Sequence, residues 1–115
     1  MTEKDSKIFI EHILESIEAI EEFSKNINEK ELHLNRLKRS AIVKEIEIIG
    51  EASKNISNKI KEKYPKIPWK EISGTRDIMA HRYFGIDITV VLKIIKNDIP
   101  KLKKQILEIK KNLKI

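Results

Sequence analysis

Four polar residues near residue 80 have types and spacing that suit acid–base and phosphate chemistry. They are Arg76, Asp77, His81 and Tyr83, in a chain whose other charges are mostly Lys and Glu. Residues four apart on a helix share a face, so the Asp77 carboxylate could orient the His81 imidazole and raise its pKa. Arg76 lies about 140° around the axis from His81, and only its long side chain would let both reach one ligand.

This set of residues suits reactions at phosphorus, although a purely structural role fits the same spacing. The imidazole of His81 can move protons near neutral pH as a general base or a general acid. The guanidinium of Arg76 is permanently charged and binds phosphate oxygens in pairs. A salt-bridged helix end, with His81 in an ordinary hydrogen bond, would have the same spacing. The residues alone leave both interpretations open.

Helices must position these residues, because apolar residues recur at helical spacing along most of the chain. One amphipathic helix is expected over about residues 5–25, and a longer one from about residue 32 to residue 57 or beyond. The longer segment is apolar on two faces, so it must pack on two sides, either as a central helix or through self-association. The apolar positions that define its two faces are Leu34, Leu37, Ala41, Ile42, Ile46, Ile48, Ile49, Ala52 and Ile56.

The second half predicts shorter helices separated by turn residues. Residues 64–69 hold two prolines and predict a bend, after which Pro68 opens a short helix with Trp69 and Ile72 facing inward. We expect Gly74 to interrupt that helix and a further helix to run from residue 75 to residue 83. Asp87 is expected to cap the next helix, Asn97–Pro100 to form a corner, and a final helix to carry Leu102, Ile106, Ile109 and Leu113.

The fold class that follows is all-α: one domain over residues 1–115, built as an antiparallel bundle of five to six helices. A chain of 115 residues has no room for a second independent core. It has no Cys, which excludes a disulfide scaffold and a Cys-ligated metal site. His12 and His33 have no second ligand at metal spacing, so we expect both to be solvated and expect neither a metal nor a cofactor. No apolar run is long enough to cross a membrane and no signal peptide is apparent, so a cytoplasmic protein is expected.

Charge is distributed unevenly along the chain. Residues 1–35 carry four Lys and nine acids, whereas residues 96–115 carry seven Lys and two acids. The basic end could attract the phosphates of a nucleic acid, or it could dock on the acidic start of the same fold or of a partner. A general nucleic-acid binder would need a recognition helix or an aromatic platform, and the sequence indicates neither.

Several blocks of the chain resemble the HepT-like branch of the HEPN superfamily. Arg76, His81 and Tyr83 form the pattern R-x4-H-x-Y of that branch. The resemblance extends, in the right order and at the right separations, over residues 48–53, 67–72, 76–87 and 97–100. One position departs from many HEPN nucleases, which have Asn directly after the Arg where this chain has Asp77.

The resemblance implies a helical bundle that dimerises and brings two R-x4-H motifs into one cleft. It implies a metal-independent endoribonuclease toxin with Arg76 and His81 as catalytic residues and RNA as the substrate. It also implies a partner, an MntA-like nucleotidyltransferase antitoxin that transfers AMP to Tyr83. Asp77 is assigned a supporting role, and Glu51 is a second supporting candidate, either lining the cleft or forming a salt bridge.

An alternative function is a non-catalytic dimeric helical module that binds or recruits a nucleotidyltransferase. In that case Arg76 and His81 would hold a nucleotide phosphate or only a helix junction. Asp77 favours this alternative, because a carboxylate near an RNA phosphate is unfavourable unless it pairs with His81 or Arg76.

Overall fold

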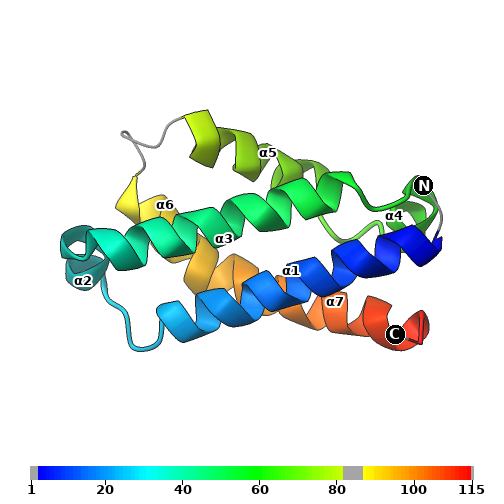
Figure 1. Ribbon diagram of the computed structural model, residues 1–115, viewed down its shortest axis with the longest axis horizontal. Helices are drawn as coiled ribbons and strands as arrows, with labels where there is room; N and C mark the ends of the chain where they lie inside the picture. Colours follow the sequence, from blue (N-terminus) through cyan, green and yellow to red (C-terminus); the bar gives the residue numbers. More distant parts are fainter. Residues whose placement is uncertain (1–2, 82–86, 115) are drawn as a thin grey trace.

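The computed structural model describes residues 3–81 and 87–114, with side chains described for positions 5–75 and 87–114. All regular structure in this part is helical (Figure 1). The elements are α1 (Glu3–Phe23), α2 (Glu29–Leu34), α3 (Arg36–Lys54), α4 (Asn58–Lys63), α5 (Trp69–His81), α6 (Ile88–Lys93), the π-helical segment η2 (Ile94–Asp98) and α7 (Ile99–Asn112). Because α6, η2 and α7 follow one another without a break, the described residues form six continuous helices, and the predicted all-α bundle is confirmed.

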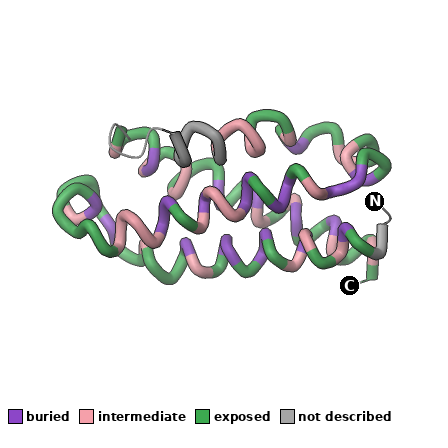
Figure 2. The backbone as a smooth tube through the Cα atoms, turned by 45° about the horizontal axis from the view of Figure 1, so that its top comes forward, coloured by how far each residue is buried: buried purple, intermediate pink, exposed green. Residues whose placement is uncertain are grey.

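Helix α3 is the central helix of the bundle. It lies between α1 and α5 and packs extensively against both (Figure 1). Its inner positions are buried, as the alternation of buried and exposed colours along the tube shows (Figure 2). Ile42, Val43, Ile46 and Ile49 are each at most 3% exposed. The packing of α3 between α1 and α5 therefore explains why this segment is apolar on two faces.

The stripes predicted for the first and last helices form most of the remaining core. On α1 the side chains of Ile10, Ile13, Ile17 and Ile20 are fully buried. On α7 the buried side chains are Leu102, Ile106 and Ile109. Phe23, which continues the α1 stripe in sequence, is 36% exposed at the end of that helix. The hydrophobic effect thus joins α1, α3 and α7 into one core.

The long helix predicted from about residue 32 to residue 57 or beyond is divided in the structure into the end of α2, then α3, and beyond residue 57 the short helix α4. Asn35 divides it: its backbone N–H donates to the carbonyl of Glu31 at the end of α2. Its side-chain oxygen accepts from the backbone N–H of Lys38 at 3.0 Å and so caps α3. At the other end Ser57 caps the short helix α4. The prediction of one helix was wrong because the apolar spacing continues past Asn35. The hydrogen bonds of Asn35 end α2 and begin α3 there.

The predicted interruption at Gly74 is wrong. The helix runs without a break from Trp69 to His81, with Gly74 in its interior. A glycine in this position costs about 1 kcal/mol relative to Ala, which the packing of α5 against α3 outweighs. Trp69 is half-buried, and its Nε1–H donates to the Tyr64 carbonyl at 3.1 Å, so it anchors the preceding bend as expected. The predicted end of this helix at Tyr83 and Gly85 lies outside the described residues.

The corner predicted at Asn97–Pro100 is also absent. The backbone stays helical there and widens into the π-helical segment η2. Pro100 has no N–H to donate to the preceding turn, so a local change of hydrogen-bond register accommodates it without ending the helix. Asp87 caps α6 as predicted, accepting from the N–H of Thr89 at 2.9 Å. The hydroxyl of Thr89 donates to the same carboxylate, and together these bonds lower the pKa of Asp87.

Opposite charges join the first and last helices, which is one of the interpretations that the uneven charge distribution left open. Lys103 of α7 lies 2.9 Å from the carboxylate of Glu21 on α1, and Lys110 lies 3.0 Å from that of Glu11. The hydrogen bond to Glu21 raises the pKa of Lys103. Part of the basic C-terminal helix therefore docks on the acidic first helix. None of the described helices is both long enough and apolar enough to cross a membrane.

Candidate functional site

The residues of the R-x4-H pattern share one uninterrupted helix. Arg76, Asp77 and His81 all lie on α5, whose last described residue is His81. Five residues on a helix correspond to about 7.5 Å along the axis, which fits Arg76 and His81 contacting neighbouring atoms of one ligand. The roles of these three residues remain predictions, because their side chains are not among those that the structure describes. Tyr83 lies outside the described residues altogether.

Glu51, the other supporting candidate, lies near the end of α3 with an exposed side chain. Its backbone carbonyl accepts from the amide of Asn55 at 2.9 Å, a contact within the same helix. Although α3 packs along α5, Glu51 does not line the pocket between them, and its role in the cleft stays a prediction. Gly50 beside it is buried.

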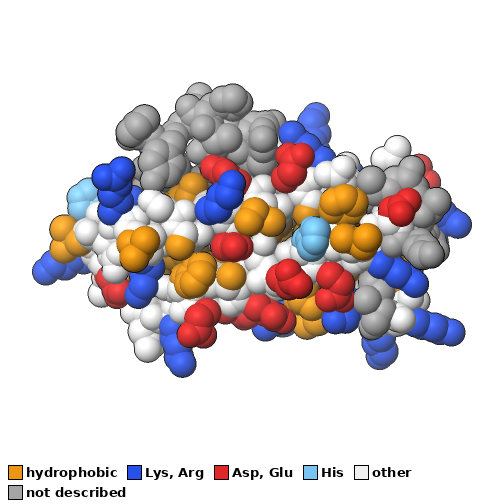
Figure 3. All heavy atoms as spheres, in the orientation of Figure 1, with side chains coloured by type: hydrophobic (Ala, Val, Ile, Leu, Met, Phe, Trp, Pro, Cys, Tyr) orange, Lys and Arg blue, Asp and Glu red, His pale blue; other side chains and the backbone are white. Residues whose placement is uncertain are grey.

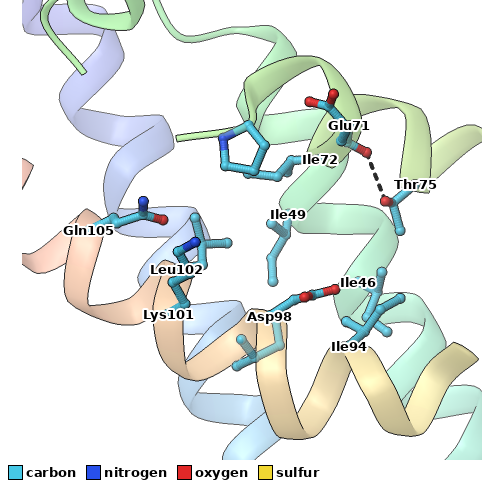
Figure 4. A pocket seen from close by; sticks show the side chains of 12 residues that line it. Ile46, Ile49, Glu71, Ile72, Thr75, Ile94, Asp98, Lys101, Leu102 and Gln105 are labelled. Carbon is cyan, nitrogen blue, oxygen red and sulfur yellow. Dashed lines mark hydrogen bonds between the residues drawn. The ribbon is translucent and has the colours of Figure 1, made fainter. Parts of the chain in front are cut away.

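A pocket of about 270 Å³ opens between α3, α5, η2 and α7 (Figure 4). Three of its wall residues, Glu71, Ile72 and Thr75, belong to α5, and Thr75 is the residue immediately before Arg76. The hydroxyl of Thr75 donates to the Glu71 carbonyl at 2.8 Å. The apolar lining consists of Ile46, Ile49, Ile72, Ile94, Ile99 and Leu102. The pocket therefore lies against the first part of the helix that carries the motif.

Polar groups from three segments surround this apolar lining. They are Glu71 and Thr75 of α5, Asp98 of η2, and Lys101 and Gln105 of α7. The Asp98 side chain points between Ile49 and Ile46, with Lys101 and Gln105 on the opposite side of the pocket (Figure 4). Asp98 precedes α7 but makes no capping hydrogen bond to that helix, so its carboxylate is not held by the backbone.

Sequence reasoning missed this pocket. Its walls come from residues 46 to 105, and no local spacing marks them as neighbours. The one local signal was the polar Asn97–Asp98 pair ahead of Pro100, which was interpreted as a corner. Ile94 and Asp98 both belong to η2, and the packing that places this segment against α3 and α5 is a property of the folded chain.

The other two histidines, His12 and His33, are exposed, as predicted. The ring of His12 makes an edge contact with Phe9 at 5.9 Å. Arg39 donates to the His33 carbonyl at 2.6 Å. Within the described ranges, no group of three or more His, Asp and Glu side chains is arranged to hold a metal ion.

Comparison with known proteins relates most of the chain to one family. A family model described as "Ribonuclease HepT-like" matches residues 13–109. The "Putative RNase MJ1380" of Methanocaldococcus jannaschii is 46% identical over 106 residues, which are 92% of this chain and 97% of that protein. The "Probable ribonuclease HepT" of Thermococcus cleftensis is 44% identical over 100 residues, 87% of this chain and 91% of that protein.

A third relative is longer than this chain. The "Gamma-glutamylcyclotransferase and putative RNase MJ0434" of Methanocaldococcus jannaschii is 47% identical over 110 residues. These are 96% of this chain but only 50% of that protein, so the chain spans half the length of this relative. No solved structure matches the chain significantly.

Proposed function

Because the chain belongs to the family of HepT-like ribonucleases, we propose that it is an endoribonuclease that cleaves RNA without a metal ion. The observation that carries the proposal is the match with relatives named as ribonucleases over nearly the whole chain. The continuity of α5 supports it further, since one rigid helix carries both Arg76 and His81.

In the proposed reaction the 2′-hydroxyl of the RNA attacks the adjacent phosphorus atom. The bond to the 5′-oxygen of the next nucleotide breaks, and the products are a 2′,3′-cyclic phosphate and a 5′-hydroxyl. A base must take the proton of the attacking hydroxyl and an acid must protonate the leaving oxygen, and His81 suits either role near neutral pH. Arg76 stabilises the extra negative charge on the phosphorane.

A two-fold dimer would complete this mechanism. One motif supplies a single imidazole, whereas a symmetric dimer supplies two and could divide the base and acid roles between them. The structure supports such a dimer with an exposed apolar surface at the junction of α2 and α3. There the side chains of Leu34 and Leu37 are 69% and 82% exposed.

The test is RNA cleavage by the purified protein in excess EDTA. We expect 2′,3′-cyclic or 3′-phosphate ends, and loss of activity in Arg76→Ala and His81→Ala with helicity unchanged. Removing the proton-transfer group is expected to slow cleavage by about 10²–10⁴-fold. His12→Ala and His33→Ala are matched controls, because both histidines are exposed and lie outside the motif. Cleavage that EDTA abolishes, or full activity in His81→Ala, would rule the mechanism out.

The proposed regulation is that of a toxin in a type VII-like toxin–antitoxin system. An MntA-like nucleotidyltransferase would transfer AMP from ATP to the Tyr83 oxygen, and pyrophosphate would leave. The modification replaces a neutral phenol with a phosphodiester that carries one negative charge. Near Arg76 this charge would pair with the guanidinium and repel incoming RNA.

Intact-mass spectrometry after co-expression with such a nucleotidyltransferase tests the regulation. We expect a mass increase of one or more AMP units that disappears in Tyr83→Phe. The control is Tyr64→Phe, because Tyr64 lies outside the motif. Its hydroxyl accepts a hydrogen bond from the side-chain amide of Asn112 at 2.8 Å. An unmodified chain that is nevertheless neutralised would indicate inhibition by binding alone.

The second candidate function is the non-catalytic dimeric partner of a nucleotidyltransferase. The observation that favours it is Asp77, a carboxylate next to the residue that should bind phosphate. Under this function RNA would remain intact in the EDTA assay, while complex formation with the nucleotidyltransferase would persist in His81→Ala.

A further inference from the structure

We propose that the pocket between α3, α5, η2 and α7 binds one unstacked guanine base of the RNA substrate. The inference rests on the proposed ribonuclease function and adds a base preference to it. Ribonucleases that act on single strands meet bases whose Watson–Crick edges are free, and proteins recognise such bases by inserting them into pockets.

The position of the pocket suits a base close to the cleaved bond. Thr75 lines the pocket, and the next residue on the same helix is Arg76, the proposed phosphate-binding residue. Consecutive Cα atoms are about 3.8 Å apart. A nucleotide whose base enters the pocket would therefore contact the helix that carries the motif.

The size and lining of the pocket suit a flat, largely apolar group. Its volume of about 270 Å³ is just below the ~300 Å³ at which typical small-molecule pockets begin. Isoleucine side chains from α3, α5 and η2 provide the surface against which a ring can pack. These dimensions favour a single base over a whole nucleotide.

The polar groups select guanine among the four bases. Guanine presents two neighbouring donors, N1–H and the N2 amino group, and one carboxylate can accept both. The Asp98 side chain is exposed at the pocket wall and makes no capping bond to α7, so its carboxylate is available to accept both donors (Figure 4). Lys101 and Gln105 lie on the opposite side and can donate to O6 or N7, the acceptors of guanine. Uracil would instead turn carbonyl oxygens toward Asp98.

The charges also argue against a phosphate as the occupant. Among the described residues that line the pocket, two are acidic, Glu71 and Asp98, and one is basic, Lys101. A carboxylate repels a phosphate but accepts hydrogen bonds from the N–H groups of a base. The π-helical segment η2 is a second sign of function, since such segments are frequent at functional sites and this one places Ile94 and Asp98 on the pocket wall.

Methyl NMR of the full-length protein with isoleucine labelling tests the site without depending on catalysis. Guanosine should shift the methyl resonances of Ile49, Ile72 and Ile94 and leave that of Ile60 in α4 unchanged. Inosine lacks the N2 amino group and should bind more weakly, and uridine should cause no shift. Equal shifts with uridine, or no shift with guanosine, would overturn the proposal.

Variants assign the preference to Asp98. Asp98→Asn replaces one acceptor oxygen by a donor and should weaken guanosine binding by about tenfold, within the range that one bidentate base contact provides. Glu108→Gln is the matched control, since Glu108 is an exposed acid of α7 that does not line the pocket. Unchanged guanosine binding in Asp98→Asn would contradict the assignment.

Mapping of cleavage sites on RNA of mixed sequence separates this proposal from the proposed function. Guanine should be enriched at one fixed position relative to the cleaved bond in the wild-type chain and not in Asp98→Asn. Cleavage without such enrichment, and without guanosine binding, would overturn the base pocket and leave the ribonuclease function standing. Guanosine binding without any cleavage would support the guanine site and refute the ribonuclease function.

Discussion

A single buried hydroxyl connects the first helix to the middle of the chain. Ser6 of α1 is fully buried, and its oxygen accepts a hydrogen bond of 2.9 Å from the backbone N–H of Ser57. Ser57 in turn caps α4 through its own side chain, which accepts from the N–H of Ile60 at 3.3 Å. The side chain at position 6 therefore satisfies a buried backbone donor that the helices themselves leave unpaired.

The first prediction is that Ser6→Ala destabilises the protein by about 1–3 kcal/mol, because it leaves the N–H of Ser57 buried without an acceptor. Ser53→Ala is the matched control. The Ser53 hydroxyl is also buried but donates to the carbonyl of Ile49 within its own helix, so its loss leaves no orphaned donor. Denaturant unfolding of both variants checks the prediction, and an equal loss of stability in the two would contradict it.

At the scale of the element, α5 carries the motif and also contains Gly74, a residue with low helix propensity. Gly74 has ordinary helical geometry, and a Cβ built on it meets no atom within 4 Å. The site is therefore open to a larger residue without steric strain. The helix forms despite the glycine because α5 packs along α3.

The second prediction is that Gly74→Ala stabilises the protein by about 0.4–1 kcal/mol, because alanine restricts the unfolded chain and adds no clash. Gly74→Pro is the opposite control, since proline removes a helical donor and should destabilise by about 3 kcal/mol or more. Thermal unfolding measures both changes. A Gly74→Ala chain that is less stable than the parent would show that the glycine is needed for close approach in an assembly.

At the scale of the whole molecule, the surface carries both charged and apolar side chains. Acidic side chains gather along α1, with hydrophobic side chains scattered beside them over α1 and α3 (Figure 3). Leu34 and Leu37 at the α2–α3 junction are the most exposed large apolar residues among those described. Exposed leucines at neighbouring positions are typical of an interface between chains.

The third prediction is that the protein is a dimer through this junction. Light scattering should give about 27 kDa, twice the chain mass of 13.5 kDa. Leu37→Glu should shift the mass toward the monomer, because the interface would bury an unpaired carboxylate. Leu107→Glu is the control, since Leu107 is an exposed leucine on α7. If both variants remain dimeric, the interface lies elsewhere.

A shared active site is the fourth prediction, and it depends on the same proposed dimer. Arg76→Ala and His81→Ala chains, each inactive alone, should recover part of the activity when mixed if each site uses residues of both chains. A fully active monomer would contradict the paired motifs.

The sequence determined the composition of the core, because apolar spacing reports which side of a helix leaves water. It identified the apolar stripes of α1 and α7 and the cap at Asp87, and it left a central helix as one of two explanations for the second helical segment. It also indicated the family, whose motif residues Arg76 and His81 lie close together in sequence on one helix. These properties are local or periodic, so neighbouring residues along the chain suffice to specify them.

The tertiary structure decided the rest. Asn35 divides a helix through hydrogen bonds that apolar spacing does not register, and packing against α3 carries α5 through Gly74. The π-helical segment replaces a predicted corner and turns Asp98 toward Ile49 (Figure 4). The pocket exists only where α3, α5, η2 and α7 meet, since its lining combines residues up to 59 positions apart, from Ile46 to Gln105. Contacts between residues so distant in sequence have no local pattern, and only the folded chain brings them together.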